Sequence, residues 1–318
     1  MKKISSIIVV RNGEKYIQKS LDSLLKQEMP KNYFFDIIIV DSMSVDNSLK
    51  IASDILKKTN ISYKILENKK LNLASGWNIA ILNSDSDLFL RIDVHSVLPS
   101  NYIKKCLEVF DNYRDNVAGV GGYLVNKASN KFGEVATKFY ESPFGNGGSP
   151  FRYKKEGIKK SDTAVYALYR KKVFTELGLL KENLNRNQDI ELHKRFIKAG
   201  YTFYTNYNLP IFYFVRSDIF SFLKKGFNDG LWIIKSKSFY LRHLIPFLFF
   251  FYLIFSLFCS IFFPAKILLI PFISYAILDF YFSFKSNCNF LTKLLLFLVF
   301  PFYHLAYGLG SFLGFLKL

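Results

Sequence analysis

Up to residue 95, short continuously apolar runs alternate with longer stretches in which apolar residues recur every three or four positions. The apolar runs show little internal alternation and predict buried strands at residues 5–10, 35–40, 62–66 and 88–94. The stretches between them predict amphipathic helices at residues 14–27, 46–58 and 74–82. This order predicts an α/β fold with a mostly parallel central sheet and helices on both of its faces.

The pattern continues, less regularly, to residue 215. It predicts further strands at residues 117–125 and 162–169, and further helices at residues 101–113, 132–141, 171–177 and 185–199. Glycines inside the strand at 117–125 indicate a bulge or a close approach by a ligand or another backbone. Residues 142–153 are rich in Gly, Pro and Ser and predict a mobile loop.

Residues 216–242 place apolar side chains at helical spacing, with basic residues on other faces. This pattern predicts an amphipathic linker helix that lies in a membrane interface, and packing against the preceding domain is the alternative. The apolar positions of this stripe are Phe220, Leu223, Phe227 and Leu231.

The chain at 243–318 is predicted to be a transmembrane region, because about 20 apolar residues are enough to cross a bilayer. Three stretches qualify, at residues 243–263, 267–284 and 294–316. The third could instead re-enter the membrane or lie in its interface. The preceding soluble domain is then predicted to span residues 1–215.

Charge is segregated along the chain. The protein has 318 residues, 50% of them hydrophobic, and a formal net charge of +18. Beyond residue 242 the charged residues are few: Lys266, Asp279, Lys285, Lys293 and Lys317. A basic domain beside an apolar tail suits the anionic cytoplasmic face of a lipid bilayer. Nucleic acid is not a predicted partner, because no recognition motif occurs.

The run at 88–96 ends in the side chains with the clearest chemical potential. On a strand, Arg91, Asp93 and His95 share one face and reach the carboxyl end, where open α/β sheets bind ligands. A carboxylate and an imidazole there can hold a divalent cation, and a simple turn is the alternative. Asp41, at the end of another predicted strand, can accept hydrogen bonds from a ribose or a base, or merely close a turn.

The segment after the first predicted strand is neither a dinucleotide fingerprint nor a phosphate-binding loop, which disfavours a dehydrogenase or a P-loop enzyme. Four motifs in order instead resemble the family 2 glycosyltransferases of GT-A fold: Arg-Asn-Gly-Glu-Lys-Tyr-Ile at 11–17, Val-Asp-Ser-x-Ser-x-Asp at 40–46, Asn78, and Arg-Ile-Asp-Val-His at 91–95. Within that family the chain is most similar to the membrane-bound succinoglycan-type glucosyltransferases of bacterial exopolysaccharide assembly.

The resemblance implies a nucleotide-sugar donor, UDP-linked in most such enzymes. It implies that Asp41 binds the uridine, that Asp93 lies near the ribose, the sugar and a metal ion, and that His95 is a metal ligand. The implied donor-binding residues are Asp41, Ser42, Asn78, Arg91 and Asp93. The imidazole of His95 makes the metal site less negative than a second carboxylate would, which favours Mn²⁺ over Mg²⁺ as the cofactor.

The helix predicted from residue 185 carries the expected catalytic base. Asp189 stands in or just before its first turn, where the helix dipole favours a carboxylate, and a capping role is the alternative. By resemblance, Asp189 is the Asp of the family's Glu-Asp motif, with Gln188 in place of the Glu, and takes the proton from the acceptor hydroxyl. Arg152, Gln188 and Trp232 are further candidates for contacts with the acceptor or a phosphate. The Gln and Arg that precede the Trp in processive synthases are missing, which counts against a processive polymer synthase.

The sequence thus predicts an inverting, metal-dependent hexosyltransferase, multi-pass in the cytoplasmic membrane, with a cytoplasmic catalytic domain. Its predicted acceptor is a polyprenyl-linked saccharide, in extracellular or cell-surface polysaccharide assembly. A transferase that charges polyprenyl phosphate itself is the near alternative. A catalytically silent membrane scaffold is the alternative from another class.

Overall fold

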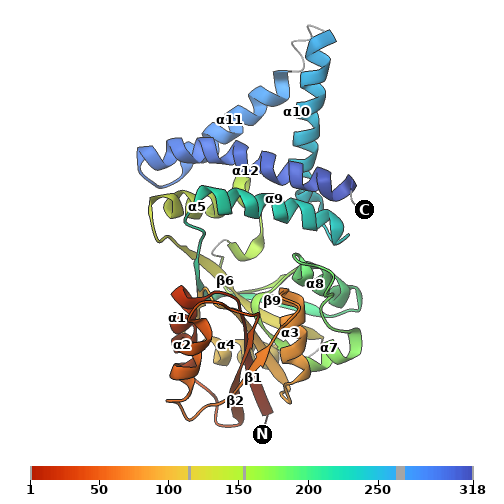
Figure 1. Ribbon diagram of the computed structural model, residues 1–318. Coiled ribbons are helices and arrows are strands. Elements are labelled where there is room, and N and C mark those ends of the chain that lie inside the picture. The colour runs from red at the N-terminus through yellow and green to blue at the C-terminus, as the bar shows by residue number, and fades with distance from the viewer. Residues whose placement is uncertain (1, 114–115, 153–154, 263–268, 317–318) are drawn as a thin grey trace. The chain divides into compact units, whose positions relative to one another are not determined.

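The structure is a computed structural model and describes residues 2–113, 116–152, 155–262 and 269–316. The chain forms two compact units (Figure 1). The first comprises residues 1–125 and 153–213, and the second comprises residues 126–152 and 214–318. A segment from within the domain predicted at 1–215 therefore belongs to the second unit.

Four parallel strands form one half of the sheet in the first unit. They are β1 (Lys2–Val10), β2 (Tyr33–Asp41), β3 (Ser62–Glu67) and β4 (Leu88–Asp93), in the order β3-β2-β1-β4. The Ile and Val side chains of β1 and β2 are almost all buried, because these strands lie between two layers of helices. The edge strand β3 is only half-buried. The four predicted strands are confirmed.

The helices between these strands lie on opposite faces of the sheet, as right-handed crossovers require. In Figure 1, α1 (Glu14–Leu25) and α2 (Ser48–Leu56) lie on one side of the sheet and α3 (Leu73–Leu82) lies on the other. Asn47 holds the cap position of α2, and the carboxylate of the preceding Asp46 accepts a hydrogen bond of 3.0 Å from Ser48 N.

The other half of the sheet is antiparallel, so the sheet as a whole is mixed. β8 (Val165–Arg170) pairs with β4 and with β6 (Val117–Lys127), while β9 (Thr202–Phe214) pairs with β5 (Ser96–Val97) and β7 (Ile158–Ser161). The sequence did not predict β5, β7 or β9. The first two are too short to carry a pattern, and polar residues and a proline interrupt the apolar positions of β9.

The glycines of β6 mark a close approach of three backbones. A Cβ on Gly121 would lie 2.3 Å from Val165 O, and a Cβ on Gly122 would lie 2.3 Å from Leu209 O. The register of β6 against β8 also shifts between Val120 and Gly122. A bulge and a close backbone approach, both open from the sequence, therefore occur together.

Two further helices, α7 (Lys171–Leu177) and α8 (Gln188–Lys198), lie on the same side of the sheet as α3 (Figure 1). Their apolar faces close a core around Trp77, Phe89 and Phe196. This core holds α3, β4 and α8 together, and these three elements carry most of the residues of the candidate site.

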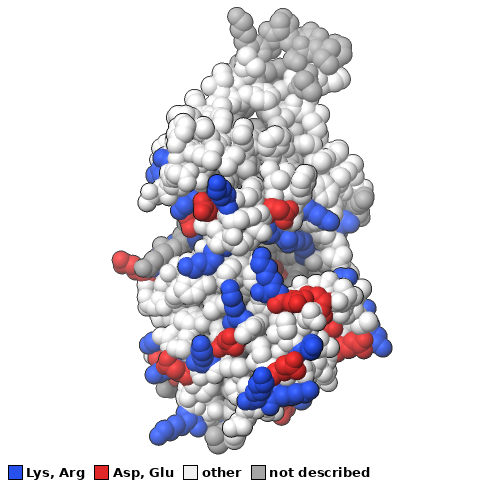
Figure 2. Space-filling model, turned by 60° about the vertical axis from the view of Figure 1, so that its left-hand side comes forward, with Lys and Arg blue, Asp and Glu red and all other residues white. Residues whose placement is uncertain are grey.

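The second unit is mostly helical. Its helices are α5 (Lys131–Glu141), α6 (Pro143–Asn146), α9 (Ile219–Lys235), α10 (Ile245–Phe262), α11 (Ile270–Lys285) and α12 (Phe290–Leu316), with short 3₁₀ turns at Pro150–Arg152 and Leu241–His243. In Figure 1, α5 and α9 run alongside α12, and α10 and α11 project away from that layer. The surface over α10 and α11 consists almost entirely of uncharged residues (Figure 2).

The segment between β6 and β7 joins this unit because its aromatic side chains pack on α12. The Phe139 ring centroid lies 5.1 Å from that of Phe300 and 4.5 Å from that of Tyr303. The Phe144 carbonyl oxygen accepts a hydrogen bond of 2.9 Å from His304 Nε2. The part of the predicted loop that forms α6 is therefore held on α12, and residue 153 lies outside the described residues.

α9 and α12 pack so closely that glycines line their contact. A Cβ on Gly230 would lie 2.0 Å from Tyr307 O, and a Cβ on Gly310 would lie 2.0 Å from Phe227 O. Two residues of the predicted apolar stripe, Phe227 and Leu231, meet α12 through their backbone atoms. Of the four stripe residues, Phe220 is 83% exposed and the other three are half-buried. One face of α9 thus packs on α12, while its apolar stripe stays partly exposed.

Within the described residues, α12 is the one helix that is both long and apolar enough to cross a membrane. Its 27 residues include the predicted third stretch. The first two predicted stretches, 243–263 and 267–284, correspond to α10 and α11, and their residues 263, 267 and 268 lie outside the described residues.

Candidate active site

The ends of β2 and β4 bring two carboxylates to one edge of the sheet. Asp41 is the last residue of β2 and pairs with Val10 of β1, while Asp93 is the last residue of β4 and pairs with Val9. Because β1 lies between them and neighbouring strands are about 4.8 Å apart, the two aspartates are roughly 10 Å apart. This is the edge at which open α/β sheets bind ligands.

Two loops at this edge are tied together by hydrogen bonds. Asn12 N donates to Ser44 Oγ at 3.0 Å, and Asn12 Oδ1 accepts from Val45 N at 3.0 Å. Glu14 N donates to Asp46 Oδ2 at 3.0 Å. The Arg-Asn-Gly-Glu and Asp-Ser-x-Ser-x-Asp motifs thus form a single wall of the site.

Asp41 and Ser42 are buried in this wall, at 8% and 2% exposed. The Asp41 carboxylate accepts a hydrogen bond of 3.1 Å from Ser44 N, and Ser42 Oγ accepts one of 2.9 Å from Asn68 Nδ2. Asp41 therefore does close a turn. A carboxylate has about four acceptor positions, so donor binding by Asp41 remains compatible with this turn and stays a prediction.

Asp93 is the last residue of β4, whereas His95 lies in the turn at residues 94–95 that leads to β5. The predicted strand therefore ends before His95, and the turn that the sequence left as the alternative holds this residue. Asp93 Oδ2 accepts a hydrogen bond of 3.0 Å from Tyr166 Oη, and Asp93 Oδ1 accepts none from any residue that the structure describes. The His95 ring meets the Tyr213 ring edge-on, with 4.8 Å between centroids. One oxygen of Asp93 is thus held by the protein and the other remains open to a ligand.

Tyr166 is a site residue that the sequence analysis missed. Besides holding Asp93, it accepts a hydrogen bond of 2.8 Å at its carbonyl oxygen from Oη of Tyr102, the first residue of α4 (Tyr102–Asn112). Its φ of 46° is a left-handed conformation that costs of order 1–3 kcal/mol, and such residues cluster at functional sites. Burial and the Asp93 carboxylate raise the pKa of Tyr166 well above its ordinary value, so its hydroxyl keeps its proton. In the sequence, a tyrosine within an apolar strand looks like a core residue.

Arg91 connects the end of β4 to α8. Arg91 Nη1 lies 3.5 Å from Asp189 Oδ2, and the guanidinium carbon lies 5.1 Å from the centre of the Trp77 ring. Burial by itself lowers the pKa of Arg91, but the carboxylates of Asp93 and Asp189 outweigh it, so the pKa is raised and the side chain stays cationic. Asp189 therefore lies beside the strand end that carries Asp93.

α8 begins at Gln188, so Asp189 stands in its first turn, as predicted. Gln188 is 4% exposed, and its Oε1 accepts no hydrogen bond from the described residues. His193 is held between Thr163 Oγ1, at 2.7 Å, and Tyr169 Oη, at 2.8 Å. Burial lowers the pKa of His193 to about 4, so its imidazole is neutral at pH 7 and serves packing rather than charge.

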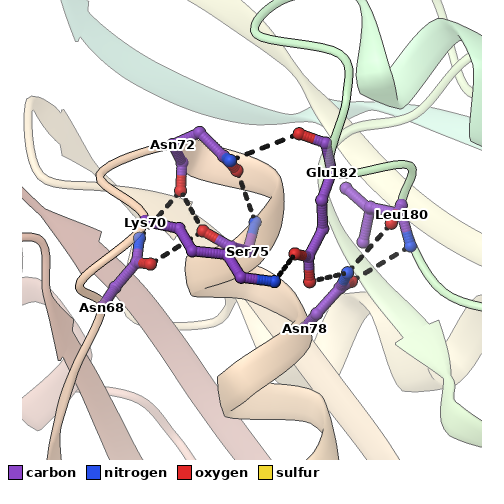
Figure 3. A network of polar contacts seen from close by, with 7 residues as sticks. All are labelled: Asn68, Lys70, Asn72, Ser75, Asn78, Leu180 and Glu182. Atoms are coloured by element: carbon purple, nitrogen blue, oxygen red, sulfur yellow. Dashed lines mark hydrogen bonds and ion pairs between the residues drawn. The ribbon is translucent and has the colours of Figure 1, made fainter.

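Asn78 holds the segment that leads into α8 (Figure 3). Its Nδ2 donates to Leu180 O at 2.9 Å and to Glu182 Oε1 at 3.0 Å, and its Oδ1 accepts from Leu180 N at 3.0 Å. Glu182 also forms an ion pair of 2.6 Å with Lys70 and accepts at its carbonyl a bond of 3.2 Å from Asn72 Nδ2. These contacts give Asn78 a structural role, and the donor contact predicted for it stays a prediction.

Asn78→Ala is expected to lower the free energy of unfolding by about 2–3 kcal/mol, because it leaves the backbone N–H and carbonyl of the buried Leu180 without their partner and removes one bond to Glu182. Thermal unfolding followed by circular dichroism should show a Tm lower by roughly 4–12 °C. Asn83→Ala is the matched control, since the Asn83 carboxamide only donates to Ile79 O at the exposed end of α3. Equal Tm values for the two variants would contradict the role of Asn78.

Arg152 and Trp232, predicted to contact the acceptor or a phosphate, lie in the second unit. Arg152 Nη1 donates to Asn126 Oδ1 at 3.1 Å, and its guanidinium carbon lies 4.4 Å from the centre of the Tyr140 ring. Trp232 is half-buried on α9, with Lys235 Nζ 5.1 Å from the centre of its ring. The other predicted site residues belong to the first unit.

The side chains of Asp93 and His95 suit a divalent cation that takes most of its ligands from a substrate. The described part of the chain contains no group of three or more His, Cys, Asp or Glu side chains that could hold a metal ion. Asp93 Oδ1 and the His95 imidazole are two donors of the kinds that Mn²⁺ accepts. Cations held by one or two protein groups and by substrate phosphates are common in enzymes that act on nucleotides.

The family model for glycosyl transferase family 2 matches residues 5–178, which include β1 to β8 and the two aspartates at the sheet edge. The chain belongs to glycosyl transferase family 2. It is a glycosyltransferase of GT-A fold, as the resemblance implied. The matched region ends at residue 178, before α8, so the family match does not include Asp189.

Two relatives of this family 2 enzyme and one solved structure of similar fold are informative. The dolichyl N-acetyl-alpha-D-glucosaminyl phosphate 3-beta-D-2,3-diacetamido-2,3-dideoxy-beta-D-glucuronosyltransferase of Methanococcus voltae is 34% identical over 79% of this chain and 80% of its own. The succinoglycan biosynthesis protein ExoA of Rhizobium meliloti (strain 1021) is 26% identical over 71% of this chain and 68% of its own, which confirms the succinoglycan-type resemblance. The mannosyltransferase PcManGT of Pyrobaculum calidifontis, solved with GDP-Man and Mn²⁺, shares the fold with a TM-score of 0.66 and 12% identity, over 97% of this chain and 86% of its own.

Proposed function

We propose that this family 2 enzyme transfers a sugar, with inversion, from a nucleotide-sugar donor to a hydroxyl of a lipid-linked saccharide. The observation that carries the proposal is the ion pair between Arg91 and Asp189, because it brings a carboxylate on α8 beside the strand end that holds Asp93. A sugar donor bound at the sheet edge and an acceptor hydroxyl bound next to Asp189 can therefore lie close enough to react.

The reaction requires one base from the protein. Asp189 takes the proton of the acceptor hydroxyl as that oxygen attacks the anomeric carbon of the donor sugar. The bond between this carbon and the donor phosphate oxygen breaks, and the nucleoside diphosphate leaves with the bonding electrons. Attack from the face opposite the leaving group inverts the configuration. No second carboxylic acid is needed, unlike in glycoside hydrolases, because a diphosphate leaves without protonation.

Asp93 and His95 are proposed to hold a divalent cation, which would neutralise charge on the leaving diphosphate. The complex of PcManGT with GDP-Man and Mn²⁺ supports a cation in this fold. Tyr166 orients Asp93 so that its Oδ1 stays available. The single carboxylate beside an imidazole favours Mn²⁺ over Mg²⁺.

A polyprenyl-linked saccharide is the proposed acceptor. The name of the M. voltae relative contains dolichyl N-acetyl-alpha-D-glucosaminyl phosphate, a lipid-linked saccharide, and ExoA is named for succinoglycan biosynthesis. The apolar helix α12, which is long enough to cross a membrane, would anchor the enzyme in the inner membrane with a cytoplasmic catalytic domain, and the apolar helices α10 and α11 would add to this anchor. Confinement to the bilayer surface raises the effective concentration of enzyme and acceptor toward each other.

The proposal is tested with the full-length protein in detergent, a panel of UDP- and GDP-sugars, and polyprenyl-linked monosaccharides, with products analysed by mass spectrometry. We expect a lipid-linked disaccharide with one donor, formed only with a divalent cation and faster with Mn²⁺ than with Mg²⁺. Full activity in Mg²⁺ alone would remove the Mn²⁺ preference. A sugar placed on bare polyprenyl phosphate would assign the enzyme to charging of the lipid carrier, and no transfer with any pair would favour the scaffold.

A further inference from the structure

Arg91 differs from the other predicted donor-binding residues in what it touches. It lies on β4 two residues before Asp93, and its side chain is 12% exposed. Its charged end meets Asp189 on α8, at 3.5 Å, and the face of the Trp77 ring on α3, at 5.1 Å. Arg91 thus contacts the proposed base directly.

Trp77 provides a rigid platform for the guanidinium. Its ring is 1% exposed and belongs to the core shared by α3, β4 and α8. A planar guanidinium stacks on an aromatic face better than a lysine ammonium does, so contact with this buried ring favours an arginine and limits the positions that its charged end can take beside Asp189.

The positive charge of Arg91 also reduces the repulsion between the carboxylates of Asp93, proposed to hold the cation, and Asp189, the proposed base. Asp93 and Asp189 are its main electrostatic partners. With a neutral side chain at position 91, the two carboxylates would repel each other across a partly buried space, and like charges there cost more than in water. Asp189 is 39% exposed, so the carboxylate that Arg91 holds is still open to an acceptor.

We propose that Arg91, held on the Trp77 ring, is a positioning residue that directs Asp189 toward the acceptor hydroxyl, and that it does not bind the donor. The inference rests on the proposed function, in which Asp189 is the base. It replaces the donor contact that the sequence implied for Arg91 with an action through Asp189.

The test compares Arg91→Met and Arg91→Lys in the full-length protein, with kcat and the donor KM measured at saturating acceptor. Arg91→Met is expected to lower kcat about 100-fold, since misplacing a reacting group by about 1 Å costs that much. The donor KM should stay within about twofold, because a loss confined to the transition state leaves binding unchanged. Arg91→Lys should recover about tenfold of the lost kcat, because it restores the charge but not the planar stacking.

Arg170→Met is the matched control. Arg170 is also an arginine of this sheet stacked on an aromatic ring, with its guanidinium carbon 4.7 Å from the centre of the Phe110 ring, but it pairs with Leu88 at the opposite end of β4. The Arg170→Met variant should therefore leave kcat unchanged. An equal fall of kcat in this control, or a raised donor KM with unchanged kcat in either Arg91 variant, would overturn the inference.

The two Arg91 variants keep the inference testable even if one of them folds poorly. Should Arg91→Met fail to fold, the split between kcat and KM in Arg91→Lys decides the same question. The proposed function is judged separately, by whether Asp189 is required for transfer. A donor-binding Arg91 would overturn the inference and leave the proposed function standing.

Discussion

Asp189→Asn is expected to lower kcat for sugar transfer by about 10²–10⁴-fold, the usual contribution of a general base. The amide has nearly the shape of the carboxylate and can still accept the hydrogen bond of 2.9 Å from Ile190 N, so α8 should begin as before. It cannot take a proton from the acceptor hydroxyl. The measurement is the initial rate of lipid-linked product at saturating donor and acceptor, together with the affinity for the free nucleoside diphosphate, which should not change.

Asp54→Asn is a suitable control for this variant. Asp54 is an exposed carboxylate on α2, and its loss changes the net charge by the same amount. It should keep full activity. If Asp189→Asn retained more than about a tenth of the activity, the assignment of Asp189 as the base would be wrong. Loss of a general base is expected to lower the rate at least about 100-fold.

Gly310→Leu is expected to destabilise the second unit by about 3 kcal/mol or more, at the upper end of overpacking effects. A Cβ at this position would lie 2.0 Å from Phe227 O and 2.8 Å from Phe227 C, both backbone atoms of α9. A rotamer change cannot relieve such a clash, so the two helices must separate. Close helix contacts over small residues are also a main source of stability between helices in membranes.

The effect of Gly310→Leu is measured as a fall in the midpoint of thermal unfolding of the full-length protein in detergent. Leu309→Ala is the control, because Leu309 is adjacent in the chain but 40% exposed. The control should change the midpoint by much less. A Gly310→Leu protein as stable as the control would contradict the close packing of α9 on α12.

The sequence predicted the catalytic half of the fold well because that half is built from local patterns. The continuous Ile and Val runs of β1 and β2 appear as buried strands from their composition alone. The position of Asp189 in the first turn of α8 follows from the apolar stripe behind it. β5, β7 and β9 were missed because two of them are very short and the third has a mixed composition.

Partners far apart in the chain could not be predicted. Asn78 and Leu180 are 102 residues apart, and nothing near either of them indicates the contact. Tyr166 looks like a core residue until its hydroxyl is found on Asp93 and its φ is found to be positive. The packing of Phe139 and Phe144 on α12 likewise moved their segment from the predicted first domain to the second unit.

The sequence by itself determined the parallel strands, the strand ends that carry Asp41 and Asp93, and the helix whose first turn holds Asp189. Each of these depends on the spacing of apolar residues within about ten positions, which can be read directly from one sequence. Only the tertiary structure decided that Arg91 contacts Asp189, that Asn78 holds the approach to α8, and that α9 packs closely on α12. These depend on contacts between elements distant in the chain, and the free energy of such contacts comes from packing that leaves no local pattern.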